Sequence, residues 1–294
     1  MGQSKLPGNR QRVVSSGELE LPERSIVNAA FTLDRDFGVS AQWEDTLGGQ
    51  VWRVKGAITS GEGRMSAPTK GGLSYTGRVE WLPFGGFEGG GERHEGDLER
   101  QQQPRLALGA GYSTNRATRR TNGQLGELFP DGAKRDVNTF IADLLFKYRG
   151  WSVLAEFFDR RSEGPPVITG EGPLAFVHEG QGVLVQASSM LGKRGQVAGR
   201  YGLVLPGERV ETVMKQREEA WLGYSYYVNG HRIKLQSALI HQWTRGRMGM
   251  DQAGNVLGIM FQVELGLLIV VIHRQALVHG GTCPPACSRC RCGA

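Results

Sequence analysis

The chain is poor in cysteine and in long apolar runs. All four cysteines of its 294 residues lie at or after Cys283, so the body of the chain has none. A cysteine-free body says little about compartment, but it suits a protein that crosses an oxidising periplasm without pairing thiols. No run of about twenty apolar residues occurs, which excludes a membrane-spanning helix. A transmembrane β-barrel is not excluded, because half of each of its strands is polar.

Several motifs of catalysis and nucleotide binding are missing. The glycine-rich segment 83–104 has no Gly-Lys-Ser/Thr step that would cradle a phosphate, and we expect it to be a solvated loop. The histidines show no metal-ligand spacing, and no Gly-x-Ser-x-Gly elbow appears. The net charge of +6 is spread along the chain rather than gathered in one stripe, which argues against nucleic-acid binding. The sequence therefore predicts no enzyme, no metal site and no cofactor.

Residues 219–242 carry the strongest structural signal. Asn229-Gly230 separates two runs of alternating residues, and Asn-Gly favours a two-residue type I′ turn because both central positions need a positive φ. Such a turn would pair Tyr226 with Ile233 in an apolar row and leave small and polar residues on the opposite face. Each arm has about ten residues, enough for a tilted strand to cross a bilayer.

The same alternation recurs along most of the chain and predicts about eleven antiparallel strands near ten residues each. Their connections alternate between short turns, near 45–49, 149–151, 191–195 and 229–230, and longer loops. Residues 1–35 are weakly patterned, and residues 24–33 fit a short helix or an inner loop. The strands are expected within residues 37–44, 52–59, 73–81, 105–112, 140–148, 151–158, 183–187, 197–203, 219–228, 231–242 and 257–265.

Two folds explain this alternation. In a soluble antiparallel sheet the apolar rows would face a core and the polar rows water. In an outer-membrane barrel the apolar rows would face lipid and the polar rows a wet channel. Short turns at one rim and long loops at the other favour the barrel, as do strands longer than the usual five or six residues (about ten).

In the barrel, the rows between the apolar ones line the lumen. Ten basic and six acidic side chains fall in these rows, and an excess of positive charge lowers the entry barrier for anions. Alternatively, these charges pair across strands, as Arg78 beside Glu80 suggests. The pairs Arg53 with Lys55 and Arg232 with Lys234 look under-compensated. The basic candidates are Arg53, Lys55, Arg78, Arg105, Lys147, Arg149, Arg160, Arg200, Arg232 and Lys234, and the acidic ones are Glu44, Glu80, Asp143, Glu156, Glu219 and Glu264.

Several short segments follow one another in order over most of residues 2–266. They are G-Q-S-K-L-P (Gly2 to Pro7), R-S-I-V-N-A-A-F-T-L-D-R-D-F-G-V (Arg24 to Val39), V-K-G-A-I-T-S-G-E-G-R (Val54 to Arg64), Y-T-G-R-V-E-W-L-P-F (Tyr75 to Phe84), E-G-D-L-E-R (Glu95 to Arg100), P-R-L-A-L-G-A-G-Y (Pro104 to Tyr112) and V-A-G-R-Y (Val197 to Tyr201). In this order they resemble the phosphate-selective porin O and P family. The resemblance implies a sixteen-stranded outer-membrane barrel, usually a homotrimer, that passes phosphate, polyphosphate or other small anions by passive diffusion.

The chain departs from this family at both ends. The family has a signal peptide and several strands before the G-Q-x-K-x-P element, whereas this chain starts there, without an apolar signal segment. We therefore expect an N-terminally truncated barrel, incomplete or open, with edges that a bilayer does not tolerate. Family members end with the last strand, near Leu265 here. Residues 267–294 form a Cys-rich tail that we expect to be disordered, unrelated to the barrel and without a zinc site, as a read-through or out-of-frame translation would be.

The sequence thus predicts an all-β fold over residues 1–266, an antiparallel up-and-down transmembrane β-barrel with about eleven of sixteen porin strands. Its expected function is passive, anion-preferring diffusion across the bacterial outer membrane. The expected partners are outer-membrane lipid, small anions and, at full length, the other subunits of a homotrimer, with no nucleic acid. Two other classes stay open: a structural or adhesive outer-membrane barrel without an open pore, and an outer-membrane barrel enzyme with two catalytic side chains converging at one rim.

Overall fold

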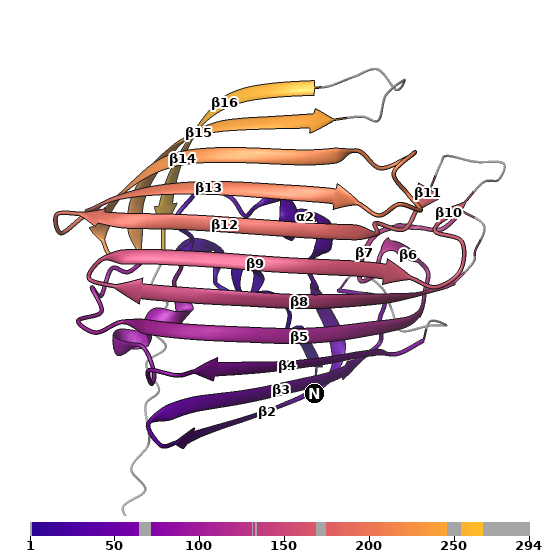
Figure 1. Cartoon of the computed structure of the whole chain (residues 1–294), viewed down its shortest axis with the longest axis horizontal. Helices are drawn as coiled ribbons and strands as arrows, with labels where there is room; N and C mark the ends of the chain where they lie inside the picture. Colours follow the sequence, from indigo (N-terminus) through magenta and orange to yellow (C-terminus); the bar gives the residue numbers. More distant parts are fainter. Residues whose placement is uncertain are drawn as a thin grey trace, which may run out of the picture.

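The protein is built on one large antiparallel sheet, seen in a computed structural model that describes residues 2–64, 72–130, 132, 134–168, 175–245 and 254–266. The sheet has 12 strands in the order β1-β2-β3-β4-β5-β8-β9-β12-β13-β14-β15-β16 (Figure 1). The all-β, antiparallel prediction is confirmed. The Cys-rich tail predicted for residues 267–294 lies outside the described residues.

Eleven of the strands are 9 to 14 residues long, as the alternation predicts, and a four-residue strand, β1, precedes them. They are β1 (Gly2–Lys5), β2 (Arg35–Leu47), β3 (Gln50–Thr59), β4 (Ser74–Leu82), β5 (Arg105–Thr118), β8 (Arg135–Tyr148), β9 (Trp151–Ser162), β12 (Gly180–Leu191), β13 (Gly195–Pro206), β14 (Gln216–Asn229), β15 (Ile233–Arg245) and β16 (Gly254–Leu265).

The remaining elements are short. None of the helices in the described ranges is long and apolar enough to cross a membrane. Two small two-stranded sheets, β6 with β7 and β10 with β11, sit in the connections β5–β8 and β9–β12. These elements are α1 (Arg10–Val13), η1 (Ser16–Glu18), α2 (Ile26–Phe31), η2 (Glu88–Arg93), β6 (Arg120–Asn122), β7 (Leu125–Leu128), β10 (Val167–Ile168) and β11 (Ala175–Phe176).

Sequential long strands are neighbours throughout, so the sheet has an up-and-down topology. Short turns join β2 to β3, β8 to β9, β12 to β13 and β14 to β15 at one rim, and the longer connections lie at the other, except for 83–104. The sheet is strongly curved, but among the described residues β16 does not pair with β1 or β2 (Figure 1). The structure therefore shows an open sheet, and closure into a barrel stays a prediction.

The two faces of the sheet differ in burial. On the outer face, apolar side chains alternate along the long strands and are exposed or half-buried; Tyr75, Val79, Tyr224 and Leu235 are between 40% and 46% exposed. On the inner face, the side chains between them are mostly buried, including polar and charged ones. The alternation thus predicted the faces correctly, but the inner face does not simply look onto water.

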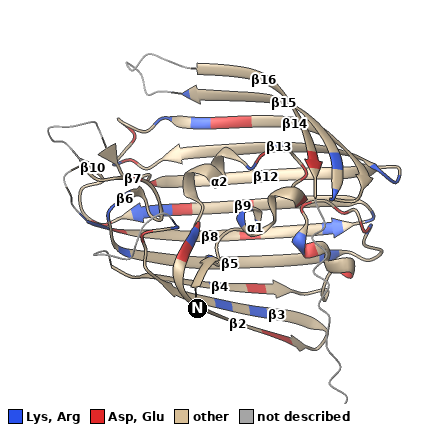
Figure 2. Cartoon of the chain, turned by 180° about the vertical axis from the view of Figure 1, so that it is seen from behind, with Lys and Arg blue, Asp and Glu red and all other residues tan. Residues whose placement is uncertain are grey.

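Two segments cover the inner face, and we call them the inner segments. The first is residues 6–34, with α1 and α2, which lie behind the sheet in Figure 1 and in front of it in Figure 2. The second is residues 83–104, where Glu95, Asp97 and Gln101 are at most 2% exposed. The prediction of a solvated loop for 83–104 was therefore wrong, because its polar side chains bind partners inside the curved sheet.

The main apolar core lies between α2 and the inner face. Ser25 caps α2, its hydroxyl accepting from the backbone N–H of Asn28 at 3.0 Å. The helix directs Val27 and Phe31 toward the sheet, where the Phe31 ring stacks on Phe158 with centroids 6.1 Å apart. Residues 24–33 are thus both a short helix and an inner segment, as the two sequence interpretations allowed.

The β14–β15 hairpin forms at Asn229-Gly230, but its predicted register was wrong. Tyr226 faces Leu235, not Ile233, so the pairing is shifted by two residues. Gly230 has φ 52°, and the irregular pairing between Tyr227 and Asn229 makes the turn longer than the two residues expected. A shift of two residues leaves every side chain on its predicted face, because strands alternate with period two.

Candidate functional site

Basic side chains on the inner face of the large sheet, which we call the wall, hold the inner segments in place. Six of the ten predicted pore-lining residues donate to main-chain carbonyls of those segments, and three of the six, Arg78, Arg105 and Arg200, also pair with carboxylates. These bonds run from Arg78 to Gly8 (2.9 Å), Lys147 to Gly91 (2.6 Å) and Gly96, Arg160 to Phe31 (2.6 Å), Arg200 to Glu23 (2.6 Å), Lys234 to Leu19 (2.6 Å) and Arg105 to Phe84.

Acidic residues of the wall bind the first inner segment as hydrogen-bond acceptors. Glu156 on β9 accepts from the backbone N–H of Gln11 at 2.6 Å and from the Asn9 amide at 2.9 Å. Glu219 on β14 accepts from the N–H of Ile26 at 3.1 Å. Ile26 is the first residue of α2, where the backbone N–H has no acceptor within the helix. The first inner segment is therefore fixed along its whole length, since donors and acceptors from many strands reach it.

A buried ion cluster lies where this segment passes β4 and β8. Arg10 contacts Asp143 at 2.9 Å and Glu80 at 3.1 Å, and Arg78 contacts the same two carboxylates at 2.6 and 2.9 Å. Lys55 adds a weaker contact to Glu80 at 3.6 Å. Three cations share two carboxylates here, so the cluster keeps a net positive charge.

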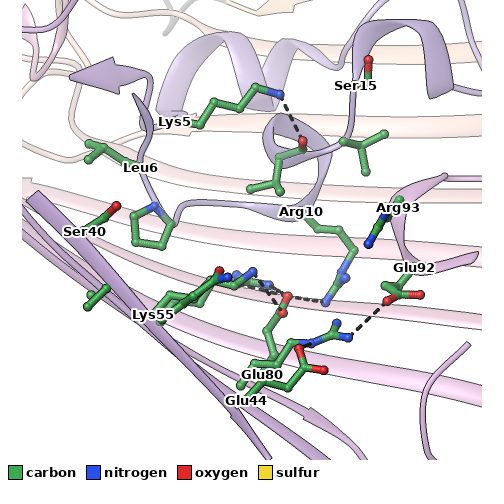
Figure 3. A pocket seen from close by; sticks show the side chains of 18 of the residues that line it. Lys5, Leu6, Arg10, Ser15, Ser40, Glu44, Lys55, Glu80, Glu92 and Arg93 are labelled. Atoms are coloured by element: carbon green, nitrogen blue, oxygen red, sulfur yellow. Dashed lines mark hydrogen bonds and ion pairs between the residues drawn. The ribbon is translucent and has the colours of Figure 1, made fainter. Parts of the chain in front are cut away.

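A cavity of about 790 Å³ opens beside this cluster, between the two inner segments and strands β1 to β4 (Figure 3). Six basic and four acidic side chains line it, which leaves it positive overall. The charged lining residues are Lys5, Arg10, Arg53, Lys55, Arg78, Arg93, Glu18, Glu44, Glu80 and Glu92.

The cations of this cavity differ in how well they are compensated. Arg53 contacts Glu44 at 2.6 Å and Glu92 at 3.1 Å, so the predicted lack of acidic partners near Arg53 was wrong. Lys5 donates to the carbonyl of Val13 at 3.1 Å and forms no ion pair with a carboxylate of the described chain. Arg93 is exposed, and no ion pair joins it to the described residues. Lys5 and Arg93 are thus the cations best placed to meet an incoming anion.

The sequence prediction found part of this site. Arg53, Lys55 and Arg78 line the cavity, whereas Arg149 and Arg232 lie exposed at turns of the short-turn rim. It missed Lys5 at the end of β1 and the cations that the inner segments supply, Arg10 and Arg93. Their only signal was basic charge in stretches without periodicity, which does not show that a stretch folds inward.

A second pocket, of about 690 Å³, lies at the short-turn rim. There His94 lies 3.2 Å from Glu99 and 3.6 Å from Glu18, and its ring packs on His231 with centroids 4.4 Å apart. Burial, followed by the charges of His94 and Lys234, lowers the pKa of His231 to about 3, so this imidazole is neutral at ordinary pH. Within the described ranges, no three His, Cys, Asp or Glu side chains are placed to hold a metal ion.

Comparison with known proteins adds no relative. No family model matches the sequence, and no curated protein and no solved structure matches it either.

Proposed function

We propose that the chain forms the wall and the inner constriction of an outer-membrane porin that prefers small anions. The observation that carries this proposal is the contrast between the two faces of one curved sheet. Exposed apolar side chains cover the outer face, while charged and amide side chains fill the inner face around a positive cavity. A lipid-facing exterior and a polar interior are the pattern of transmembrane β-barrels.

Aromatic side chains support the orientation in a bilayer. At the short-turn rim, Trp52 and Trp81 stack with centroids 5.5 Å apart. Toward the long-loop rim, the Phe140 and Phe157 rings lie 6.4 Å apart, as do the Tyr201 and Trp243 rings. Aromatic rings near both ends of the strands fit the two girdles that barrels place at the membrane interfaces. The resemblance to phosphate-selective porins points to the same function.

The experiment is a measurement of reversal potential in planar bilayers. Protein refolded with lipid should give current steps, and a salt gradient should give the sign of an anion-preferring channel. Lys5→Glu and Arg93→Glu should each reduce this preference, because they reverse the cations that no carboxylate of the described chain offsets. Arg161→Glu is the matched control, since Arg161 is exposed on β9 away from the cavity. Cation preference in the wild type would refute the proposed selectivity.

A second candidate function is a structural or adhesive barrel without an open pore. The observation that favours it is the filling of the inner face, where residues 6–34 and 83–104 bind the wall through buried charged groups. The same bilayer experiment separates the two functions. Protein that inserts into the bilayer but gives no current steps would support the closed barrel.

A further inference from the structure

The two inner segments meet at a pair of buried carboxylates. Glu20 belongs to the first segment and Glu95 to the second, and each is 2% exposed. One amide nitrogen, Nε2 of Gln186 on β12, lies 2.8 Å from an oxygen of each carboxylate. Glu95 also accepts from the backbone N–H of Glu20 at 3.0 Å, so the two acidic groups are held side by side.

The side chains that donate hydrogen bonds to this pair are all neutral. Glu20 also accepts from Gln196 at 2.7 Å and from the hydroxyl of Ser188, and Glu95 accepts from Gln11 at 3.2 Å. Neither carboxylate forms a salt bridge within the described part of the chain. The nearby lysines, Lys147 and Lys234, direct their ammonium groups at main-chain carbonyls instead. Two buried like charges without a paired cation cannot both ionise cheaply.

We propose that one proton bound by this carboxylate pair controls the contact between the two inner segments, drawing them together in acid and loosening them in base. With Glu20 protonated, its hydroxyl donates a hydrogen bond toward Glu95 or toward Oε1 of Gln186. That amide oxygen is buried and has no hydrogen-bond partner among the described residues. With both groups ionised, repulsion pushes the segments apart.

The pKa of Glu20 agrees with this geometry. Burial, followed by the charge of Glu95, raises the pKa of Glu20 to about 7. The folded protein therefore binds this proton more tightly than the unfolded chain, in which the pKa is about 4.5. The stabilisation is largest in acid and is lost as the pH rises from about 4.5 to about 7. The other titratable groups that face the pair are Lys147 from β8, Glu156 from β9, Arg200 from β13, Tyr227 from β14, Lys234 from β15 and Arg24 from the first inner segment.

The test compares the wild type with Glu20→Gln, which mimics the protonated group. Refolded protein in detergent is melted at about pH 5 and about pH 8.5. From about pH 5 to about pH 8.5, the melting temperature of the wild type should fall by at least about 3 °C more than that of Glu20→Gln. Glu208→Gln is the control, because Glu208 is exposed in the β13–β14 connection, and it should behave like the wild type. Equal pH dependence in the wild type and Glu20→Gln would overturn the proposal.

Infrared spectra keep the proposal testable if Glu20→Gln does not fold. Because burial also raises the pKa of Glu156 to about 7, the spectra are recorded in a Glu156→Gln background, where a protonated-carboxyl band should persist above about pH 5 and disappear near about pH 7. The absence of that band at about pH 5 would overturn the proposal, and its shift to lower pH in a folded Glu95→Gln variant would support it, because the charge of Glu95 is the second cause of the raised pKa of Glu20.

A further consequence rests on the proposed function. Channel conductance should rise as the pH passes about 7, because the loosened segments leave a wider passage. A protein without channel currents but with the expected melting and infrared results would refute the porin and leave the proton-controlled contact intact. A protein that conducts, but whose melting and infrared results do not depend on Glu20, would refute the proton-controlled contact and leave the porin intact.

Discussion

Arg160 shows how a single wall residue fixes the first inner segment. Its guanidinium is 1% exposed, lies 5.6 Å above the Phe31 ring, and donates to the carbonyls of Phe31 at 2.6 Å and Ala30 at 3.3 Å. These carbonyls end α2, where no intrahelical donor remains for them. A cation at the C-terminal end of a helix also meets the favourable end of its dipole.

We predict that Arg160→Met destabilises the protein by about 2–3 kcal/mol, because buried carbonyls lose charged donors that water cannot replace. The measurement is urea unfolding in detergent micelles. Arg161→Met is the matched control, since the Arg161 side chain is 77% exposed and pairs only with Asp159 among the described residues. That control should stay within about 0.5 kcal/mol of the wild type. A loss of equal size in both variants would contradict this role for Arg160.

The sequence predicted which face Arg160 occupies but not what it binds. Alternation along residues 151–158 continues into the rest of β9 and places Arg160 inside. Its carbonyl partners Ala30 and Phe31 lie about 130 positions earlier, and nothing in the local pattern reports such a distant contact. The same holds for Lys147 and Lys234, whose carbonyl partners belong to segments without periodicity.

At the scale of elements, the seating of α2 on β12 depends on a glycine. A Cβ at Gly182 would lie 2.6 Å from a methyl carbon of Val27 and 2.9 Å from the Phe31 ring. We predict that Gly182→Ala costs about 1–3 kcal/mol, because the helix must move away from the sheet. The measurement is again urea unfolding, in which tryptophan fluorescence reports the loss of the inner-segment packing.

Gly199→Ala on the adjacent strand is the control for that substitution. A Cβ there would meet nothing closer than 3.8 Å, so the same added methyl group should have little effect. Equal losses for the two variants would show that glycine flexibility, rather than contact with α2, decides the result.

The hairpin and the 83–104 segment mark the limits of prediction at this scale. The Asn-Gly pair located the turn, but the pairing also depends on the irregularity at Tyr227, which turn statistics do not contain. Residues 83–104 look solvated because they are rich in glycine and charge. Their polar groups are instead satisfied inside the curved sheet, as the bonds of Asp97 to the N–H groups of Gln101 and Gly150 show.

At the scale of the whole molecule, the number of long strands and the sidedness of the sheet followed from alternation alone. The position of the inner segments did not, because their sequences carry no period. The edges of the sheet also differ from its middle. Outer-face residues on β16, such as Leu257 at 80% and Phe261 at 79% exposure, are more open than Leu222 on β14 at 57%. Among the described residues β16 pairs with β15 alone, which accounts for the difference, because each strand in the middle of the sheet is screened on both sides.

Whether the outer face contacts lipid can be decided by one substitution. Leu222 lies near the middle of β14, 57% exposed on that face. We predict that Leu222→Arg lowers the stability of vesicle-inserted protein by about 2–4 kcal/mol, because a guanidinium near the bilayer midplane loses its hydration. The measurement is urea unfolding from lipid vesicles.

Leu191→Arg makes the same change at the same face and a similar exposure, 52%, but at the end of β12 beside the short-turn rim. There the cost should fall to about 0–1 kcal/mol, because the guanidinium reaches the lipid headgroups. An outer face in water would tolerate both changes equally, since exposed Leu→Arg removes no buried contact at either position. The depth dependence therefore separates lipid from water without requiring channel activity: a difference between the two variants indicates a bilayer around the sheet, and equal small effects would contradict the membrane assignment.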